Sequence, residues 1–200
     1  TSTPNNYNYV WNTSPVTTQN AVSTSSITVS PGSTTNYTVT ATNATTGCSA
    51  SQNTTVLVNP LPIISGGTYI CVNAQSQLTG TATAANNNAW VSNNTGVATI
   101  SATGLVSALS IGTAQITYTN SLGCSNSVTV NVVAFPVITG PSAVCVGSTV
   151  QLNGSGTAAS WTSSNLSVAT VNATGQVSGI SVGNSTITYV TNTGCSNTIS

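Results

Sequence analysis

The sequence predicts an all-β chain made of small antiparallel β-sandwiches in tandem. Three observations predict this: apolar residues alternate with Thr over short runs, turn signals separate those runs, and the whole pattern returns after 71 to 74 residues. No helical apolar pattern of useful length is present. Alternation at period two gives each strand one buried face and one hydroxyl-covered face, so each unit buries a core between two sheets.

The repeat emerges when the chain is compared with itself. Trp90–Cys124 aligns without gaps onto Trp161–Cys195 at an offset of 71, with 18 of 35 positions identical. Upstream, residues 61–71 align onto 135–145 at an offset of 74. The three-residue difference falls near residues 84–88, which we therefore place in a loop.

A more distant unit precedes these two, because Trp11, Tyr37 and Gly47-Cys48 match positions of the later repeats. We expect a window from a longer tandem array, with short Pro-containing junctions that favour an extended rod. The predicted domains are residues 1–60, whose first half is missing, 61–135, and 136–200, which lacks its final strand.

The individual strands and turns follow from the same two signals. Alternation predicts strands at residues 37–41, 116–118, 128–132 and 187–189. Turn residues punctuate them at Pro31-Gly32, Asn94-Thr95-Gly96, Asn172-Ala173-Thr174-Gly175 and Asn192-Thr193-Gly194.

The composition excludes most chemical functions. The 200 residues include no Lys, Arg, Asp, Glu or His, whereas Ser, Thr and Asn fill 92 positions. General acid or base catalysis and an activated Ser nucleophile both need groups that this chain lacks. The same absence argues against calcium, zinc and nucleic acid as partners. We therefore expect no enzyme activity, no cofactor and no metal. No apolar run approaches the ~20 residues that span a bilayer, so we expect no membrane insertion.

Two segments carry a family resemblance: WVSNNTGVATISATGLVSALSIGTAQITY (90–118) and WTSSNLSVATVNATGQVSGISVGNSTITY (161–189). Both resemble the bacterial immunoglobulin-like group 2 repeat, with its Trp-x-Ser strand, Val-Ala-x-Val, Gly-x-Val step and Ile-Thr strand. The first unit is more similar to immunoglobulin-like repeats in large surface proteins of the Bacteroidota. The resemblance implies tandem immunoglobulin-like sandwiches that act as spacers in secreted adhesins and fibres.

The five cysteines recur in register with the repeat. That register pairs Cys71 with Cys124 and Cys145 with Cys195, which closes loops of 53 and 50 residues, and it leaves Cys48 with a partner upstream of Thr1. A loop of that size contributes about 4 kcal/mol in the chain-entropy account. The alternative is free buried thiols in a reducing compartment, although matched pairs fit an oxidising one.

One Trp and one Tyr of each unit fall within predicted strands. We interpret Trp11, Trp90, Trp161, Tyr37, Tyr118 and Tyr189 as core residues, since a large aromatic supplies much of a small sandwich's stability. The alternative for Trp90 is stacking on a carbohydrate, beside the loop at residues 84–89 that differs from its counterpart at 157–160.

These observations favour a structural function: the repeat region of an extracellular bacterial fibre or adhesin stalk, secreted or at the cell surface. Its partners are copies of itself or neighbouring repeats, because uncharged surfaces do not repel one another. In a sharper form, a strand from a neighbouring molecule completes an incomplete sandwich. A module that binds glycans or abiotic surfaces is the alternative.

Overall fold

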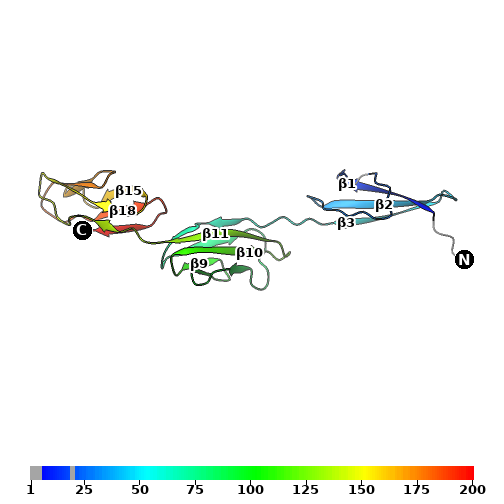
Figure 1. The fold of residues 1–200 in the computed structure, drawn as a ribbon, viewed down its shortest axis with the longest axis horizontal. Helices are drawn as coiled ribbons and strands as arrows, with labels where there is room; N and C mark the ends of the chain where they lie inside the picture. Colours follow the sequence, from blue (N-terminus) through cyan, green and yellow to red (C-terminus); the bar gives the residue numbers. More distant parts are fainter. Residues whose placement is uncertain (1–5, 19–20) are drawn as a thin grey trace. The chain divides into compact units, whose positions relative to one another are not determined.

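The computed structural model describes residues 6–18 and 21–200, without the side chains of 158 and 159, and it contains strands and no helix there (Figure 1). The prediction of an all-β chain is confirmed. The chain divides into two compact units, residues 1–60 and 61–200. The second unit holds both of the closely related repeats, which are called the second and third domains below.

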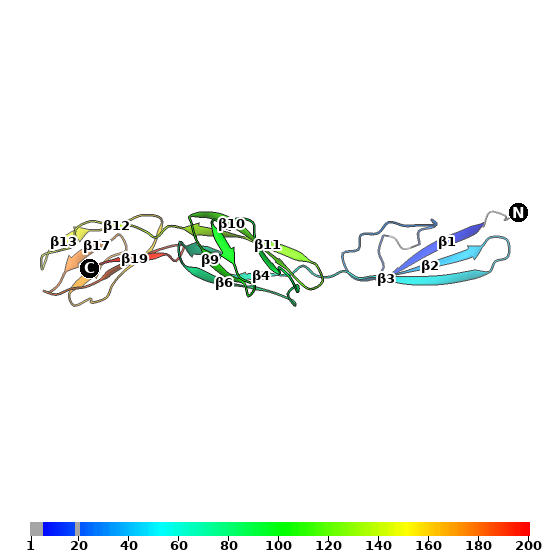
Figure 2. The same ribbon diagram turned by 90° about the horizontal axis from the view of Figure 1, so that it is seen from below.

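The first unit is one antiparallel sheet in the order β1-β2-β3 (Figure 2), with strands β1 (Tyr7–Ser14), β2 (Thr35–Asn43) and β3 (Ser49–Val56). Trp11 is half-buried in β1, and its indole Nε1 donates a hydrogen bond to the Thr24 carbonyl at 2.9 Å. Tyr37 of β2 is buried.

The second domain is a sandwich of two four-stranded sheets, in the orders β4-β6-β9-β8 and β5-β11-β10-β7. Its strands are β4 (Ile64–Gly66), β5 (Tyr69–Cys71), β6 (Gln75–Gly80), β7 (Trp90–Ser92), β8 (Ala98–Ile100), β9 (Leu105–Ala108), β10 (Gly112–Thr119) and β11 (Ser125–Val133). All ladders are antiparallel except β5 with β11, which run parallel.

The core of the second domain lies where the two sheets meet. Strand β10 shows the expected alternation, because Ala114, Ile116 and Tyr118 are buried while Thr113 and Gln115 are exposed. Residues from both sheets form one apolar cluster: Ile70, Leu78, Ala98, Val106, Ala108, Ala114, Ile116, Val130 and Val132.

The third domain has a similar strand order, with β18 and β19 shorter than β10 and β11. Its strands are β12 (Ile138–Thr139), β13 (Thr149–Gln151), β14 (Asn153–Gly154), β15 (Ala158–Ser163), β16 (Ala169–Val171), β17 (Gln176–Gly179), β18 (Ile187–Thr191) and β19 (Ser196–Ile199). Its sheets are β12-β14, β13-β17-β16 and β15-β18-β19. The buried cluster is smaller, with Leu152, Ala169, Val177 and Ile187 at its centre.

Candidate functional site

A disulfide crosses from the second domain to the third. It joins Cys71 to Cys195 with the two Cα atoms 5.7 Å apart, which lies within the usual range for the bond, and the two residues are 124 positions apart in sequence. Cys71 is the last residue of β5, and Cys195 lies in the turn between β18 and β19. The bond therefore holds two successive repeats together covalently.

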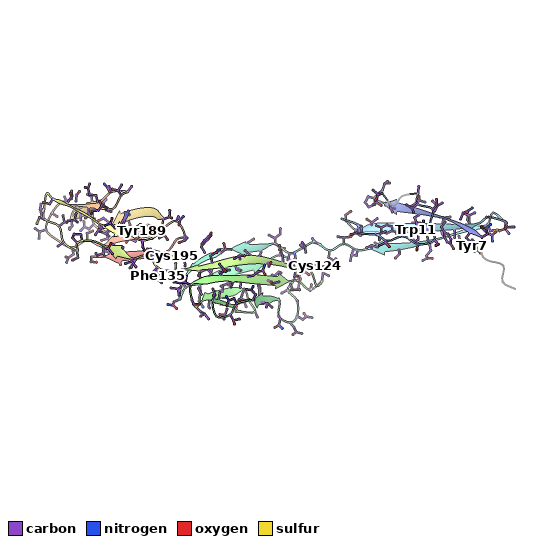
Figure 3. The ribbon with its side chains drawn as sticks, viewed as in Figure 1. Tyr7, Trp11, Cys124, Phe135, Tyr189 and Cys195 are labelled. Carbon is purple, nitrogen blue, oxygen red and sulfur yellow. A yellow bond between two sulfur atoms is a disulfide. The ribbon has the colours of Figure 1, made fainter. Side chains whose placement is uncertain are left out.

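The expected pairs Cys71–Cys124 and Cys145–Cys195 are wrong. Cys71 lies beside Val133, the last residue of β11, whereas Cys124 precedes Ser125, the first. Strand β11 has 9 residues, so at about 3.3 Å each the two cysteines are separated by roughly 30 Å. A disulfide tolerates about 7 Å between Cα atoms. Figure 3 shows Cys124 at one end of the second domain and Phe135 and Cys195 near the other.

The backbone around Cys195 is fixed by the hairpin that carries it. The Thr191 amide donates to the Cys195 carbonyl at 2.8 Å, and the Thr191 hydroxyl donates to the same oxygen at 3.0 Å. Gly194, at φ +86°, makes the left-handed step of the turn and donates to the Thr191 carbonyl. Cys195 is 1% exposed, so the bond lies with one sulfur inside the protein.

The backbone around Cys71, the other half of the disulfide, is also fixed by hydrogen bonds. It pairs with Val133 in the parallel ladder, and its carbonyl accepts a hydrogen bond from the Ala74 amide at 2.9 Å. The Val72 amide donates to the Val133 carbonyl, which carries the ladder one residue further. Both halves of the disulfide thus sit on backbone that each domain orders by itself.

The other three cysteines take no part in that bond. Cys48 lies in the β2–β3 turn and is exposed, and Cys145 is exposed on the segment before β13. Cys124 is half-buried in the β10–β11 turn.

The aromatic residues form one ring pair in each of the last two domains. The centroids of Trp90 and Tyr118 are 4.5 Å apart, and those of Trp161 and Tyr189 are 4.4 Å apart. The tyrosines are buried, whereas both tryptophans are half-buried. The Tyr118 hydroxyl donates to the Ala82 carbonyl at 2.9 Å. A close, tilted ring pair with a satisfied hydroxyl is typical of a packed core.

Two glycines that the sequence argument did not single out make room for these tyrosines. A Cβ on Gly80 would collide with the ring of Tyr118, and one on Gly154 with the ring of Tyr189. The sequence repeat could have pointed to both glycines, because Gly80 and Gly154 are equivalent at the offset of 74. Their side-chain-free surface lets the ring lie directly on the backbone.

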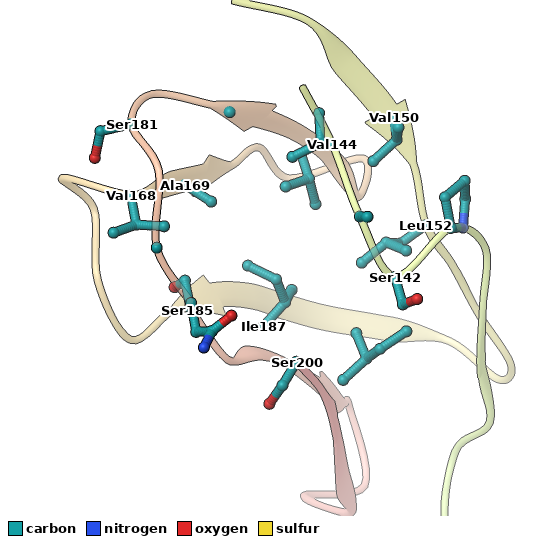
Figure 4. Close-up of a pocket in the computed structure, with 17 residues that line it drawn as sticks. Ser142, Val144, Val150, Leu152, Val168, Ala169, Ser181, Ser185, Ile187 and Ser200 are labelled. Atoms are coloured by element: carbon teal, nitrogen blue, oxygen red, sulfur yellow. The ribbon is translucent and has the colours of Figure 1, made fainter. Parts of the chain in front are cut away.

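A cavity of about 190 Å³ opens into the core of the third domain (Figure 4). Its walls include Val144, Leu152, Val177, Ile187 and Ile199. In the second domain the corresponding space holds Val130 and Val132 of β11, which are 0% and 2% exposed. At the offset of 71 their counterparts would follow Ser200. The cavity is therefore the space that a Val-x-Val strand fills in the neighbouring sandwich.

The sequence matches the family described as bacterial Ig-like domain (group 2) twice, at residues 67–134 and 136–199. The chain belongs to this family. The family is a structural one without catalysis, and membership indicates a repeat region of an extracellular or cell-surface protein. No curated protein matches the chain.

Solved structures that resemble these Ig-like repeats include surface layer protein SbsC, domains 1–6, at 18% identity and a TM-score of 0.36, covering 96% of this chain and 34% of that one. The human desmocollin-1 ectodomain matches at 12% identity and a TM-score of 0.31, covering 96% and 52%. Drosophila N-cadherin EC1-4 matches at 10% and 0.28, covering 100% and 67%. The chain thus spans about a third of the surface layer fragment.

Among the described residues, His, Cys, Asp and Glu form no cluster of three or more that could hold a metal ion. Within the same residues no helix is long and apolar enough to cross a membrane. Asn86, Asn87 and Asn88 are exposed beside Trp90, as the glycan hypothesis requires, but one face of the Trp90 ring is covered by Tyr118.

Proposed function

We propose that the chain is a load-bearing part of an extracellular stalk or fibre, in which successive Ig-like repeats are joined by disulfides as well as by the backbone. The observation that carries this proposal is the Cys71–Cys195 bond between adjacent domains. A disulfide inside one domain would protect that domain alone, whereas this one fixes the position of one repeat against the next. Fixed neighbours suit a spacer that holds a distal part away from a surface.

The bond also changes how the chain responds to tension. A force applied at the two ends enters at Cys71 and leaves at Cys195 through the sulfur atoms, so the 124 residues of sequence between them bear none of it once the flanking chain is taut. At about 3.6 Å per residue, the bond withholds about 450 Å of extension.

The uncharged surface supports lateral association of such stalks. With no Lys, Arg, Asp, Glu or His, two copies meet without net repulsion, and added salt has nothing to screen. Hydroxyl and amide groups cover the exposed strand faces, so contacts between copies depend on hydrogen bonds and on exposed apolar residues such as Leu166 and Val182.

Single-molecule force spectroscopy tests the load-bearing function. The oxidised chain, pulled from its ends, should extend about 450 Å less than the same chain in dithiothreitol. Full extension without reductant would contradict the proposal.

Small-angle scattering and a glycan array separate the spacer from its alternatives. A compact body of 200 residues has a radius of gyration of about 16 Å, and a spacer should exceed this value clearly. A value near 16 Å argues against the stalk. Glycan binding that is lost when Asn86, Asn87 and Asn88 are changed to Ala would favour the binding module instead.

A further inference from the structure

The cysteines fall into two classes by their place in the repeat. The class called strand-end cysteines consists of Cys71, the last residue of β5, and Cys145, its equivalent at the offset of 74, which itself lies before β13 and in no strand. The hairpin cysteines are Cys48, Cys124 and Cys195, each of which follows a glycine in the turn before the last strand of its unit. The observed bond joins one member of each class, from successive repeats.

The three hairpin cysteines lie in similar turns, although the turn before Cys48 is one residue longer than the other two. The carbonyls of Cys48, Cys124 and Cys195 accept hydrogen bonds at 2.9, 2.9 and 2.8 Å from the amide at the start of the turn. The preceding glycines have φ values of +74°, +79° and +86°. Cys48 therefore follows a positive-φ glycine and closes its hairpin as Cys195 does, in a turn that is one residue longer.

The two strand-end cysteines are followed by the same turn, although only Cys71 is paired in a strand ladder. The Cys71 carbonyl accepts from the Ala74 amide at 2.9 Å, and the Cys145 carbonyl accepts from the Ser148 amide at 3.0 Å. The residue two places after each cysteine has a positive φ, +65° and +79°, and its amide donates to Ala108 or to the equivalent Gly179 at 2.9 Å. Cys145 thus occupies in the third domain the position from which Cys71 reaches the next repeat.

We propose that the Cys71–Cys195 bond is one rung of a series: Cys145 bonds to the hairpin cysteine of another repeat of this type, and Cys48 accepts the strand-end cysteine of another. Both thiols are exposed, and the partner that Cys145 was expected to have, Cys195, is already bonded to Cys71. This inference deepens the proposed stalk function and rests on it. The partner repeat comes either from the same polypeptide or from a second copy.

The chemistry of each rung balances with a small disulfide as the oxidant. One thiolate attacks oxidised glutathione, which releases one reduced glutathione and leaves a mixed disulfide on the protein. The second protein thiolate then attacks that sulfur and releases the second reduced glutathione. Two thiols are oxidised to one protein disulfide, and one glutathione disulfide is reduced to two thiols.

Peptide mapping tests the series on two chains. The first is the 200-residue chain, mixed in equal amounts with a ¹⁵N-labelled copy, oxidised in a glutathione buffer and blocked with N-ethylmaleimide. Thermolysin replaces trypsin, which has no Lys or Arg at which to cut. The second is the same chain with residues 130–200 repeated after Ser200, which continues β19 in register; in the repeated segment the copy of Cys145 is changed to Ser, so that one hairpin cysteine is added, and the copy of Ser196 is changed to Thr, so that the added peptide differs in mass.

The expected result is a Cys71–Cys195 link within single chains and a Cys145 link to a hairpin cysteine. Mixed-label Cys145 peptides identify a second copy as the source, and unmixed links to the added hairpin identify the same polypeptide. Either result supports the series. If Cys145 is blocked by N-ethylmaleimide in both chains, or pairs mainly with another Cys145, the series is wrong. In that case a Cys71–Cys195 link leaves the stalk proposal standing, whereas its absence removes the basis of both.

A variant with the thiol moved by one residue tests whether the pairing depends on the position of Cys145 or only on its exposure. Cys145→Ser should lose the ladder of multimers on a non-reducing gel of the 200-residue chain, if copies supply the partner. Cys145→Ser combined with Val146→Cys moves the thiol by one residue onto a side chain that is also exposed. Equal hairpin linkage from position 146 in the lengthened chain would overturn the proposal, because any exposed thiol would then suffice.

Discussion

Removing the inter-repeat disulfide should destabilise the third domain far more than removing an exposed cysteine does. The informative variants are Cys71→Ser, which breaks the bond at its half-buried end, and Cys145→Ser, which removes the equivalent exposed thiol one repeat later. Cys195→Ser is less clean, because it leaves a hydroxyl in a site that is 1% exposed.

The magnitude follows from the loop that the bond closes. Cys71 is paired with Val133, so a third domain that unfolds alone leaves the 62 residues from Val133 to Cys195 as a closed loop on a folded neighbour. In the chain-entropy account, closing a loop of this length removes about 4 kcal/mol of unfolded-state entropy. When both domains unfold, the loop spans 124 residues and the figure rises to about 5 kcal/mol.

Native-state hydrogen exchange resolved by peptide measures the effect in each domain separately. In Cys71→Ser, the slow amides of β18 and β16 should exchange roughly a thousandfold faster, which corresponds to about 4 kcal/mol. In the monomer of the 200-residue chain, where Cys145 bonds to no further repeat, Cys145→Ser should leave them within a factor of about three. Equal rates in the two variants and the parent would refute the reasoning, because the bond would then constrain nothing that matters to unfolding.

Three further outcomes are expected. Gly154→Ala should destabilise the third domain by about 1–3 kcal/mol, because the new Cβ meets the Tyr189 ring and overpacks the core. Each kcal/mol should lower the melting temperature by roughly 4–8 °C. Gly32→Ala, which has open space around it, should leave the melting temperature unchanged. Appending Val-Asn-Val-Val after Ser200 should fill the cavity and stabilise the third domain by about 3 kcal/mol in urea titrations, and Ser-Asn-Ser-Ser should not. The melting temperature should agree within about 1 °C between pH 5 and 7, because the chain has no side chain that ordinarily titrates there; a larger shift would contradict this account.

The sequence was sufficient for the fold because its signals are local. The alternation Ala114, Ile116, Tyr118 determines which face of β10 is buried, and it does so through contacts between residues two apart. The glycine before each hairpin cysteine predicts the turn for an equally local reason, since only that position needs a positive φ. The ring pairs could be placed in strands in the same way, although the glycines beneath them required the structure.

The disulfide pairing could not be predicted from such local signals. Nothing local determines which end of β11 the short strand β5 pairs with, yet that register decides whether Cys71 lies near Ser125 or near Val133. The parallel β5 is the exception among otherwise antiparallel ladders of the second domain. An alignment of the repeats shows which cysteines are equivalent, but it does not show whether a cysteine bonds within its own repeat or to the next one.

The two pairings differ in what they do to an array, even though each uses two cysteines per repeat. Bonds within repeats leave a row of independent domains, each of which unfolds according to its own stability. Bonds between successive repeats make the unfolding of one domain depend on its neighbour, so stability becomes a sum of repeat terms and interface terms along the array. We therefore expect the stability of the third domain to depend on Cys71, a residue of the preceding domain.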